Sequence, residues 1–386
     1  MTKGTGRLTL LMAVAAVVSL QVPASMLAQG RGGGGGGGGT PKVTVNHKAR
    51  QNRPIQLGVS GGNANDVANG FCCSGTLGAL VENAQGQFIL SNAHVFAHDT
   101  LASTADPDMA TIGDPINQSG LIDVACQDRP SDYVASLSSL SSINPGAMSP
   151  VDAAIAEVEP GMVDADGAIL EIGTISSTPA PASLNLGVKK SGRTTGLTAS
   201  RIEGINATIS VGYSSECGGP EFTSIYTGQI IAGNRGSKFI AGGDSGSLMV
   251  ENVGTNPRAV GLLFAGSSSI AVANPIGDVL TYFGVSLVGQ PGAGGTSAAI
   301  DPINQGAARA MAVQARNATR LISVPGAIGH AVGLGGNAPV IKVYVETITE
   351  RARQATPASL EGVPVVLEAT GPVTAIGAMG QCGPAR

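Results

Sequence analysis

The sequence predicts a mainly β protein. From about Asn52 to Leu287, short apolar runs are interrupted by glycine-rich breaks. The chain has 57 glycines, no tryptophan and only 12% charged residues, which suits tight turns because glycine tolerates positive φ. Short apolar runs bounded by turn residues are typical strands of a sandwich or barrel. The runs are Gly75 to Val81, Gln87 to Leu90, Val134 to Leu137, Ala153 to Val158, Ile202 to Val211, Ser247 to Val250 and Ala259 to Phe264.

The first residues form the pattern of a signal peptide. Lys3 and Arg7 precede an apolar stretch from Leu8 to Leu20, and the small residues Ala24 and Ala28 offer cleavage points. An apolar core of about 13 residues is too short to cross a bilayer of roughly 30 Å as a helix. We therefore expect residues 1–28 to be removed and the protein to be soluble and exported, secreted or periplasmic, without a stable membrane anchor.

The remaining chain divides by composition. Residues 29–51 begin with a glycine run and indicate a flexible tether. Residues 52–288 carry the strand pattern, and residues 289–300 are a glycine-rich linker. Residues 301–386 predict a small α/β module with a flexible end, which we expect to fold independently and to be dispensable for catalysis. Its expected elements are a helical stretch at Asp301 to Arg320, a strand at Val340 to Val345, a helical stretch at Thr347 to Gln354 and a strand at Val363 to Leu367, with glycine-rich turns near Gly326 and Gly333.

Charge and cysteine content exclude several classes. The formal charge is −4, and −6 after loss of Lys3 and Arg7, so the chain lacks the basic footprint of a nucleic-acid binder. Five cysteines in an exported chain predict one or two disulfides and a leftover thiol. With no C-x-x-C pair and four histidines, we expect neither a metal nor another cofactor.

A serine in the run Gly-Gly-Asp-Ser-Gly-Ser, at position 245, is the candidate nucleophile. Flanking glycines allow a tight turn that exposes the hydroxyl and brings backbone N–H groups together beside it. A hydroxyl needs a base to take its proton, and the base needs a group that fixes its tautomer. His94, at the end of an apolar strand, is the candidate base, and Asp152, which opens an uncharged strand after a Ser-Pro turn, is the candidate third member.

The order His94, Asp152, Ser245, in Ala-His, Asp-x-Ala and Gly-Asp-Ser-Gly contexts, resembles that of trypsin-like serine proteases. The segments VKKSGRTTGLT, GGDSGSL and VGLLFAG are similar to bacterial members of the narrow-leaf type, and the resemblance covers roughly Ile55 to Leu287. It implies a chymotrypsin-like double six-stranded β-barrel followed by a small C-terminal α/β domain. It also implies a serine endopeptidase that acts on peptides or proteins through an acyl-enzyme.

The resemblance assigns further residues. The N–H groups of Gly243 and Ser245 would form the oxyanion hole. The primary substrate pocket would be lined by Phe239, Phe264 and Gly266, whose apolar floor disfavours basic substrate residues. A disulfide would join Cys73 to Cys126. The chain departs from the animal enzymes in lacking an Ile-Val-Gly-Gly type terminus, so Asp244 is not expected to pair with a freed amino group.

Several alternatives are weaker. His98 is a rival base and Asp123 and Asp132 are rival carboxylates, but all three are expected in solvated loops. His47 and His330 are expected to be structural or on the surface. Lys189, Lys190 and Arg193 are expected to be a solvated hairpin edge rather than an anion site. A second functional class is a catalytically silent scaffold that binds partners through its C-terminal module.

Overall fold

The computed structural model describes Met1 and residues 45–101, 109–291 and 302–383, with burial left out for residues 302–304. The predicted signal peptide, the tether up to residue 44 and most of the linker lie outside these residues. From Val45 onward the chain forms one compact unit. Among the described helices, none is both long and apolar enough to traverse a bilayer.

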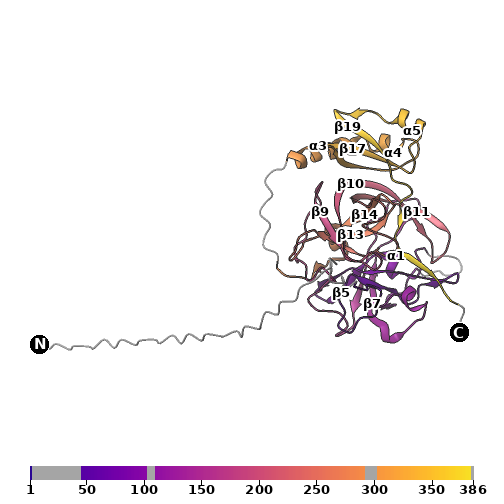
Figure 1. The fold of residues 1–386 in the computed structure, drawn as a ribbon, viewed down its shortest axis with the longest axis vertical. Coiled ribbons are helices and arrows are strands. Elements are labelled where there is room, and N and C mark those ends of the chain that lie inside the picture. The colour runs from indigo at the N-terminus through magenta and orange to yellow at the C-terminus, as the bar shows by residue number, and fades with distance from the viewer. Residues whose placement is uncertain (2–44, 102–108, 292–301, 384–386) are drawn as a thin grey trace, which may run out of the picture. The chain divides into compact units, whose positions relative to one another are not determined.

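The structure is mainly β and contains two large sheets of ten and eleven strands (Figure 1), which confirms the predicted fold class. In the ten-stranded sheet the order is β15-β4-β5-β8-β7-β6-β1-β3-β2, with β21 on β3. Its strands are β1 (Val59–Asn63), β2 (Val67–Ala68), β3 (Phe71–Leu77), β4 (Ala79–Asn83), β5 (Gly86–Ser91), β6 (Pro115–Asn117), β7 (Tyr133–Leu140), β8 (Ala154–Val158), β15 (Ser286–Leu287) and β21 (Ala378–Gln381).

The eleven-stranded sheet runs β11-β14-β13-β12-β9-β10-β16-β17-β19-β18, with β20 against β10 and β13. Its strands are β9 (Gly187–Lys190), β10 (Thr198–Ser214), β11 (Glu221–Gly233), β12 (Leu248–Glu251), β13 (Ala259–Gly266), β14 (Ile270–Pro275), β16 (Ala327–Gly335), β17 (Ala338–Val345), β18 (Ser359–Leu360), β19 (Val363–Ala369) and β20 (Thr374–Ala375). The helices are α1 (Ala93–Phe96), α2 (Ile276–Phe283), α3 (Pro302–Arg316), α4 (Ala318–Ile322) and α5 (Glu350–Ala355), with 3-10 turns at Leu121–Val124 and Pro130–Asp132.

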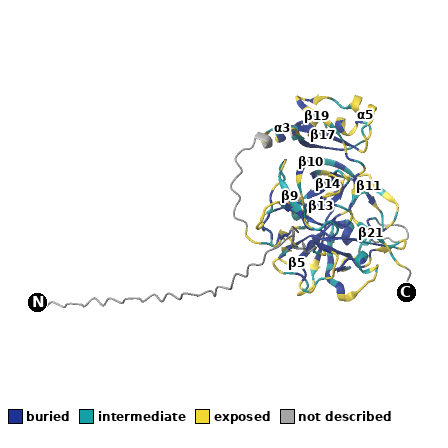
Figure 2. Ribbon diagram, viewed as in Figure 1, coloured by how far each residue is buried: buried dark blue, intermediate teal, exposed yellow. Residues whose placement is uncertain are grey.

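Strand burial follows the sequence pattern. All eight residues of β13 are buried, as expected for a strand covered on both faces, and this strand lies in the dark interior of Figure 2. The longer β10 is buried mainly at alternate positions, because successive side chains of a strand point to opposite faces. Each apolar run predicted as a strand overlaps a strand of the structure.

The C-terminal part contributes strands to both sheets. β16 pairs antiparallel with β10, so the sheet of β9–β14 continues directly into β16–β19 (Figure 1). The short strands β20 and β21 return to the main body, where they pair with β13 and β3. The C-terminal part thus adds five strands to the six of β9–β14 and one strand, β21, to the other sheet, which has nine strands without it.

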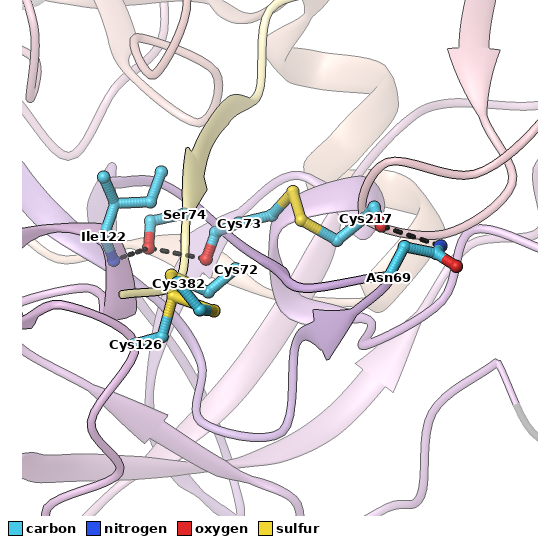
Figure 3. The surroundings of a disulfide bond; sticks show 8 residues. All are labelled: Asn69, Cys72, Cys73, Ser74, Ile122, Cys126, Cys217 and Cys382. Carbon is cyan, nitrogen blue, oxygen red and sulfur yellow. Dashed lines mark hydrogen bonds between the residues drawn. A yellow bond between two sulfur atoms is a disulfide. The ribbon is translucent and has the colours of Figure 1, made fainter. Parts of the chain in front are cut away.

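Three disulfide contacts involve the five cysteines. Cys73 is bonded to Cys217, so the predicted bridge between Cys73 and Cys126 is wrong. Cys72 and Cys73 are neighbours on β3, and their side chains therefore leave the strand on opposite faces. Cys126 lies at bonding distance from both Cys72 and Cys382 (Figure 3). A sulfur atom forms one disulfide at a time, so Cys126 has two alternative partners.

We expect Cys73→Ser to lower the free energy of unfolding by about 2–5 kcal/mol, because the lost bridge closes a long loop. Cys382→Ser is the matched control, since Cys126 can still bond to Cys72 and the loss should be smaller. Denaturant unfolding of the oxidised proteins measures both. Equal unfolding midpoints for the two variants would contradict the assignment of the Cys73–Cys217 bridge.

Candidate active site

The site lies between the two sheets. His94 belongs to the single-turn helix α1 that follows β5, and Asp152 lies two residues before the start of β8, the neighbour of β5. Ser245 comes from the loop between β11 and β12 of the other sheet. The Nδ1 atom of His94 is 2.6 Å from Oδ2 of Asp152, and its Nε2 atom is 2.8 Å from Oγ of Ser245. The structure thus brings the three predicted residues into one hydrogen-bonded chain.

Asp152 is fully buried and held from several sides. Its Oδ1 accepts the backbone N–H of Ala93 at 2.8 Å and that of His94 at 3.3 Å. The side-chain amide of Asn274 donates to its backbone carbonyl at 3.1 Å. These bonds stabilise an ionised carboxylate away from water, and they fix it opposite Nδ1 of His94, which must then carry a hydrogen.

The site has a fourth group, Tyr213, which was not among the predicted residues. Its hydroxyl lies 2.9 Å from Oδ2 of Asp152 and 2.8 Å from the hydroxyl of Tyr226. Since a carboxylate only accepts, the Tyr213 hydroxyl donates to Asp152. The pKa of Tyr213 is raised well above its usual range, mainly by burial and secondly by the negative charge of Asp152. The Tyr213 hydroxyl therefore keeps its proton. The one available signal was an apolar alternation on β10 that ends in tyrosine.

We expect Tyr213→Phe to lower kcat about tenfold with KM nearly unchanged, because Asp152 loses a charge-assisted hydrogen bond and holds His94 less firmly. Tyr213 is a positioning residue in this account. Tyr282→Phe makes the same chemical change at a side chain with 44% exposure and should leave both constants as they are. Steady-state kinetics on an ester substrate measures them, and an unchanged kcat for Tyr213→Phe would contradict the role.

The loop that carries Ser245 needs glycine on both sides. Gly243 and Gly246 have φ values of +96° and +89°, which L side chains rarely adopt. A Cβ atom on Gly246 would also lie 2.2 Å from Oγ of Ser91 and from the carbonyl oxygen of Thr76. The strand β3 and the end of β5 therefore pack directly against this loop. Ser245 itself is fully buried.

The remaining predicted site residues surround the C-terminal segment. The N–H of Gly243, a predicted oxyanion-hole donor, donates to the carbonyl oxygen of Ile376 at 2.5 Å. The carbonyl of Phe264 accepts the N–H of Ile376 at 3.1 Å, and Gly266 pairs with Thr374. Phe239 shares an apolar cluster with Ile376. Phe239 and the backbone of Phe264 thus lie against Ile376 of the chain itself, whereas Gly266 pairs at Thr374 and the Phe264 side chain packs in a separate apolar cluster with Tyr226.

Asp244 forms a buried ion pair with Lys190. Lys190, predicted at a solvated edge, is fully buried with its Nζ atom 3.4 Å from Oδ2 of Asp244. Desolvation by burial lowers the pKa of Lys190, and the charge of Asp244 opposes that shift. Backbone N–H groups of Thr194 and Thr195 donate to Oδ1 of the same carboxylate. Lys190 thereby anchors the residue next to Ser245.

Three other charged residues expected on the surface, Arg193, Asp123 and Asp132, are also in ion pairs. Arg193 is buried and makes two hydrogen bonds to Asp123, at 2.9 and 2.7 Å. Asp132 is buried and lies 2.7 Å from Arg50. Because each charge has an ionic partner, these residues can be buried although charged residues are usually solvated. His98 lies 3.2 Å from Asp114 and not in the triad, while His47 and His330 are both buried.

No family model and no curated protein matches the chain. Solved structures that resemble it include a glutamic-acid-specific serine protease, at 16% identity over 60% of this chain and 100% of that chain, with a TM-score of 0.39. Thermobifida fusca protease A gives 19% identity over 61% and 99%, with a TM-score of 0.39. A Nocardiopsis protease gives 16% identity over 60% and 98%, with a TM-score of 0.38. The likeness concerns the fold, and no activity is transferred from it.

Proposed function

We propose that the protein is an exported serine endopeptidase that hydrolyses peptide bonds through an acyl-enzyme. The observation that carries the proposal is the continuous hydrogen-bonded chain from Asp152 through His94 to Ser245. In this order Nε2 of His94 is free of a hydrogen and can take the proton of the Ser245 hydroxyl. A serine with a purely structural role needs only a hydrogen-bond partner. The buried Asp152 carboxylate on the other nitrogen of His94 goes beyond that need and suits a base.

The chemistry runs in two halves. Oγ of Ser245 attacks the substrate carbonyl carbon while its proton moves to Nε2 of His94, and the Gly243 N–H stabilises the oxyanion. His94 then protonates the leaving nitrogen as the C–N bond breaks. Water attacks the resulting ester and gives a proton to Nε2 of His94, which passes it to Oγ of Ser245 as the ester bond breaks and the carboxylic acid leaves. Asp152 keeps the imidazole in the required tautomer throughout.

Export is part of the proposal. The leader pattern at residues 1–28 and a disulfide between Cys73 and Cys217 both suit an oxidising compartment.

A chain that ends at Gly371, and so omits the segment around Ile376, is incubated with a mixture of peptides of known sequence to test the activity. Mass spectrometry should reveal new internal cleavage products that are absent when the same chain carries Ser245→Ala. Products formed equally by both proteins would come from a contaminant and would contradict the proposal, as would the absence of any product.

A further inference from the structure

The segment after Val373 crosses the site in an extended conformation. Its first strand, β20, pairs antiparallel with the end of β13, where Ala375 lies opposite Ala265. Its second strand, β21, pairs antiparallel with β3 of the other sheet. Extended peptides bind to sheet edges in this manner, with main-chain hydrogen bonds that do not depend on sequence. The segment 373–381 therefore lies across both sheets at the place where they meet.

The hydrogen bonds of Ile376 fix the position of the segment relative to Ser245. Its N–H donates to the Phe264 carbonyl at 3.1 Å, and its carbonyl oxygen accepts from the Gly243 N–H at 2.5 Å. A backbone donor beside the nucleophile binds the oxygen of the carbonyl that is attacked. Ile376 thus occupies the place of the substrate residue whose carbonyl forms the acyl-enzyme.

The next residue agrees with this direction. A Cβ atom on Gly377 would lie 3.5 Å from Cδ2 and 3.8 Å from Nε2 of His94. Gly377 therefore lies beside His94, the group that must protonate a leaving amine. With Ile376 on the acyl side and Gly377 on the leaving side, the chain direction is that of a substrate.

The side chain of Ile376 indicates what the pocket accepts. It is 8% exposed and belongs to an apolar cluster that includes Phe239 and Ile240. A cavity of about 220 Å³ adjoins His94 and is walled partly by Ala375, Gly377 and Met379. With the segment in place, the His94 side chain is only 5% exposed and Ser245 is fully buried. An external peptide cannot reach Ser245 unless the segment moves.

Building on the proposed function, we propose that residues 373–381 are an internal ligand of the substrate cleft, bound in the direction of a substrate with Ile376 in the primary pocket. The intact chain therefore keeps its own site occupied. The external substrates are peptides with an aliphatic residue before the cleaved bond, because a charged side chain in this apolar pocket would lose hydration without gaining a partner.

The rate of labelling by a fluorophosphonate tests the occupancy in the full chain. Ile376→Glu places a carboxylate in the apolar pocket and should displace the segment, which raises the labelling rate by about tenfold or more. Val366→Glu, at a β19 side chain with 41% exposure, makes the same charge change away from the cleft and should label at the wild-type rate. A chain that ends at Gly371 lacks the segment and should label at least as fast as Ile376→Glu. If the Ile376→Glu variant does not fold, the chain that ends at Gly371 serves as the test protein in its place.

The activated enzyme then tests the substrate class. Peptides that differ only in the residue before the cleaved bond should be cut fastest with isoleucine or valine and about tenfold or more slowly with lysine or glutamate. Equal labelling rates for the full chain and both activated forms would overturn the occupancy. A preference for a charged residue would overturn the pocket assignment. No labelling of any form would overturn the proposed hydrolysis and this proposal with it.

Discussion

Ser245→Ala and His94→Ala should each reduce ester hydrolysis by about four orders of magnitude or more, because the two side chains act in one proton-transfer unit. The double variant should be no slower than the worse single variant, since removing one member already disables the other. Both reacting atoms lie within 2.8 Å of each other, so either change removes the same step.

Initial rates measured in a chain that ends at Gly371 give the comparison, and circular dichroism shows that each variant is folded. His98→Ala is the control because His98 lies next to Asp114 outside the triad, and its rate should remain within about twofold of the parent. Appreciable turnover by pure Ser245→Ala protein would contradict the assignment of the nucleophile.

Lys190→Met should lower the free energy of unfolding by about 3–5 kcal/mol, because it leaves the Asp244 carboxylate buried without its cation. Both side chains are fully buried, so water cannot compensate. The same ammonium also donates to the Gly196 carbonyl at 2.9 Å, which ties the loop before β10 to the loop of Ser245. Lys190→Met should therefore also slow catalysis.

Lys189→Met is the matched control on the same strand. Lys189 is half-buried and, among the described residues, its Nζ atom donates to the carbonyl of Val253 in an exposed hydrogen bond, so the loss should stay below about 1 kcal/mol. Adding Asp244→Asn to Lys190→Met should recover part of the stability, since the buried charge is then gone. Denaturant titration measures all three variants, and coincident curves for the two lysine variants would contradict a buried ion pair.

The triad could be predicted because each member has a local signature. Ser245 is flanked by glycines, His94 ends an apolar strand and Asp152 opens one. Their chain order then restricts the architecture. Tyr213 could not be found in the same way, because its contact with Asp152 depends on how β10 packs against the other sheet and leaves no pattern nearby in the sequence.

The wrong expectations share a physical cause. The sequence does not show which face of a strand will be buried, and neighbouring residues of a strand point to opposite faces. Lys189 and Lys190 are adjacent, but β9 directs one outward and the other inward. Cys72 and Cys73 differ for the same reason. Glycine-rich turns are predicted near Gly326 and Gly333, yet the chain from Ala327 to Gly335 forms β16, and its glycines permit close approach of β10, since a Cβ on Gly329 would lie 2.3 Å from the Thr208 carbonyl oxygen.

The predicted independence of the C-terminal part rests on composition alone. Composition shows a glycine-rich break near residues 289–300, but it does not show that β16 pairs with β10 or that Ile376 reaches Phe264. Truncation after Leu287 would expose the long edge of β10. We therefore expect that shortened chain to aggregate more readily than a chain that ends at Gly371.

Identification of the residue that carries a fluorophosphonate adduct tests the central claim most directly. Peptide mapping of labelled wild-type and Ile376→Glu proteins should place the adduct on Ser245, and Ser245→Ala and His94→Ala proteins should carry none. Such a result requires a serine activated by a histidine. An adduct on another residue, or none on either of the first two proteins while both are folded, would contradict the account.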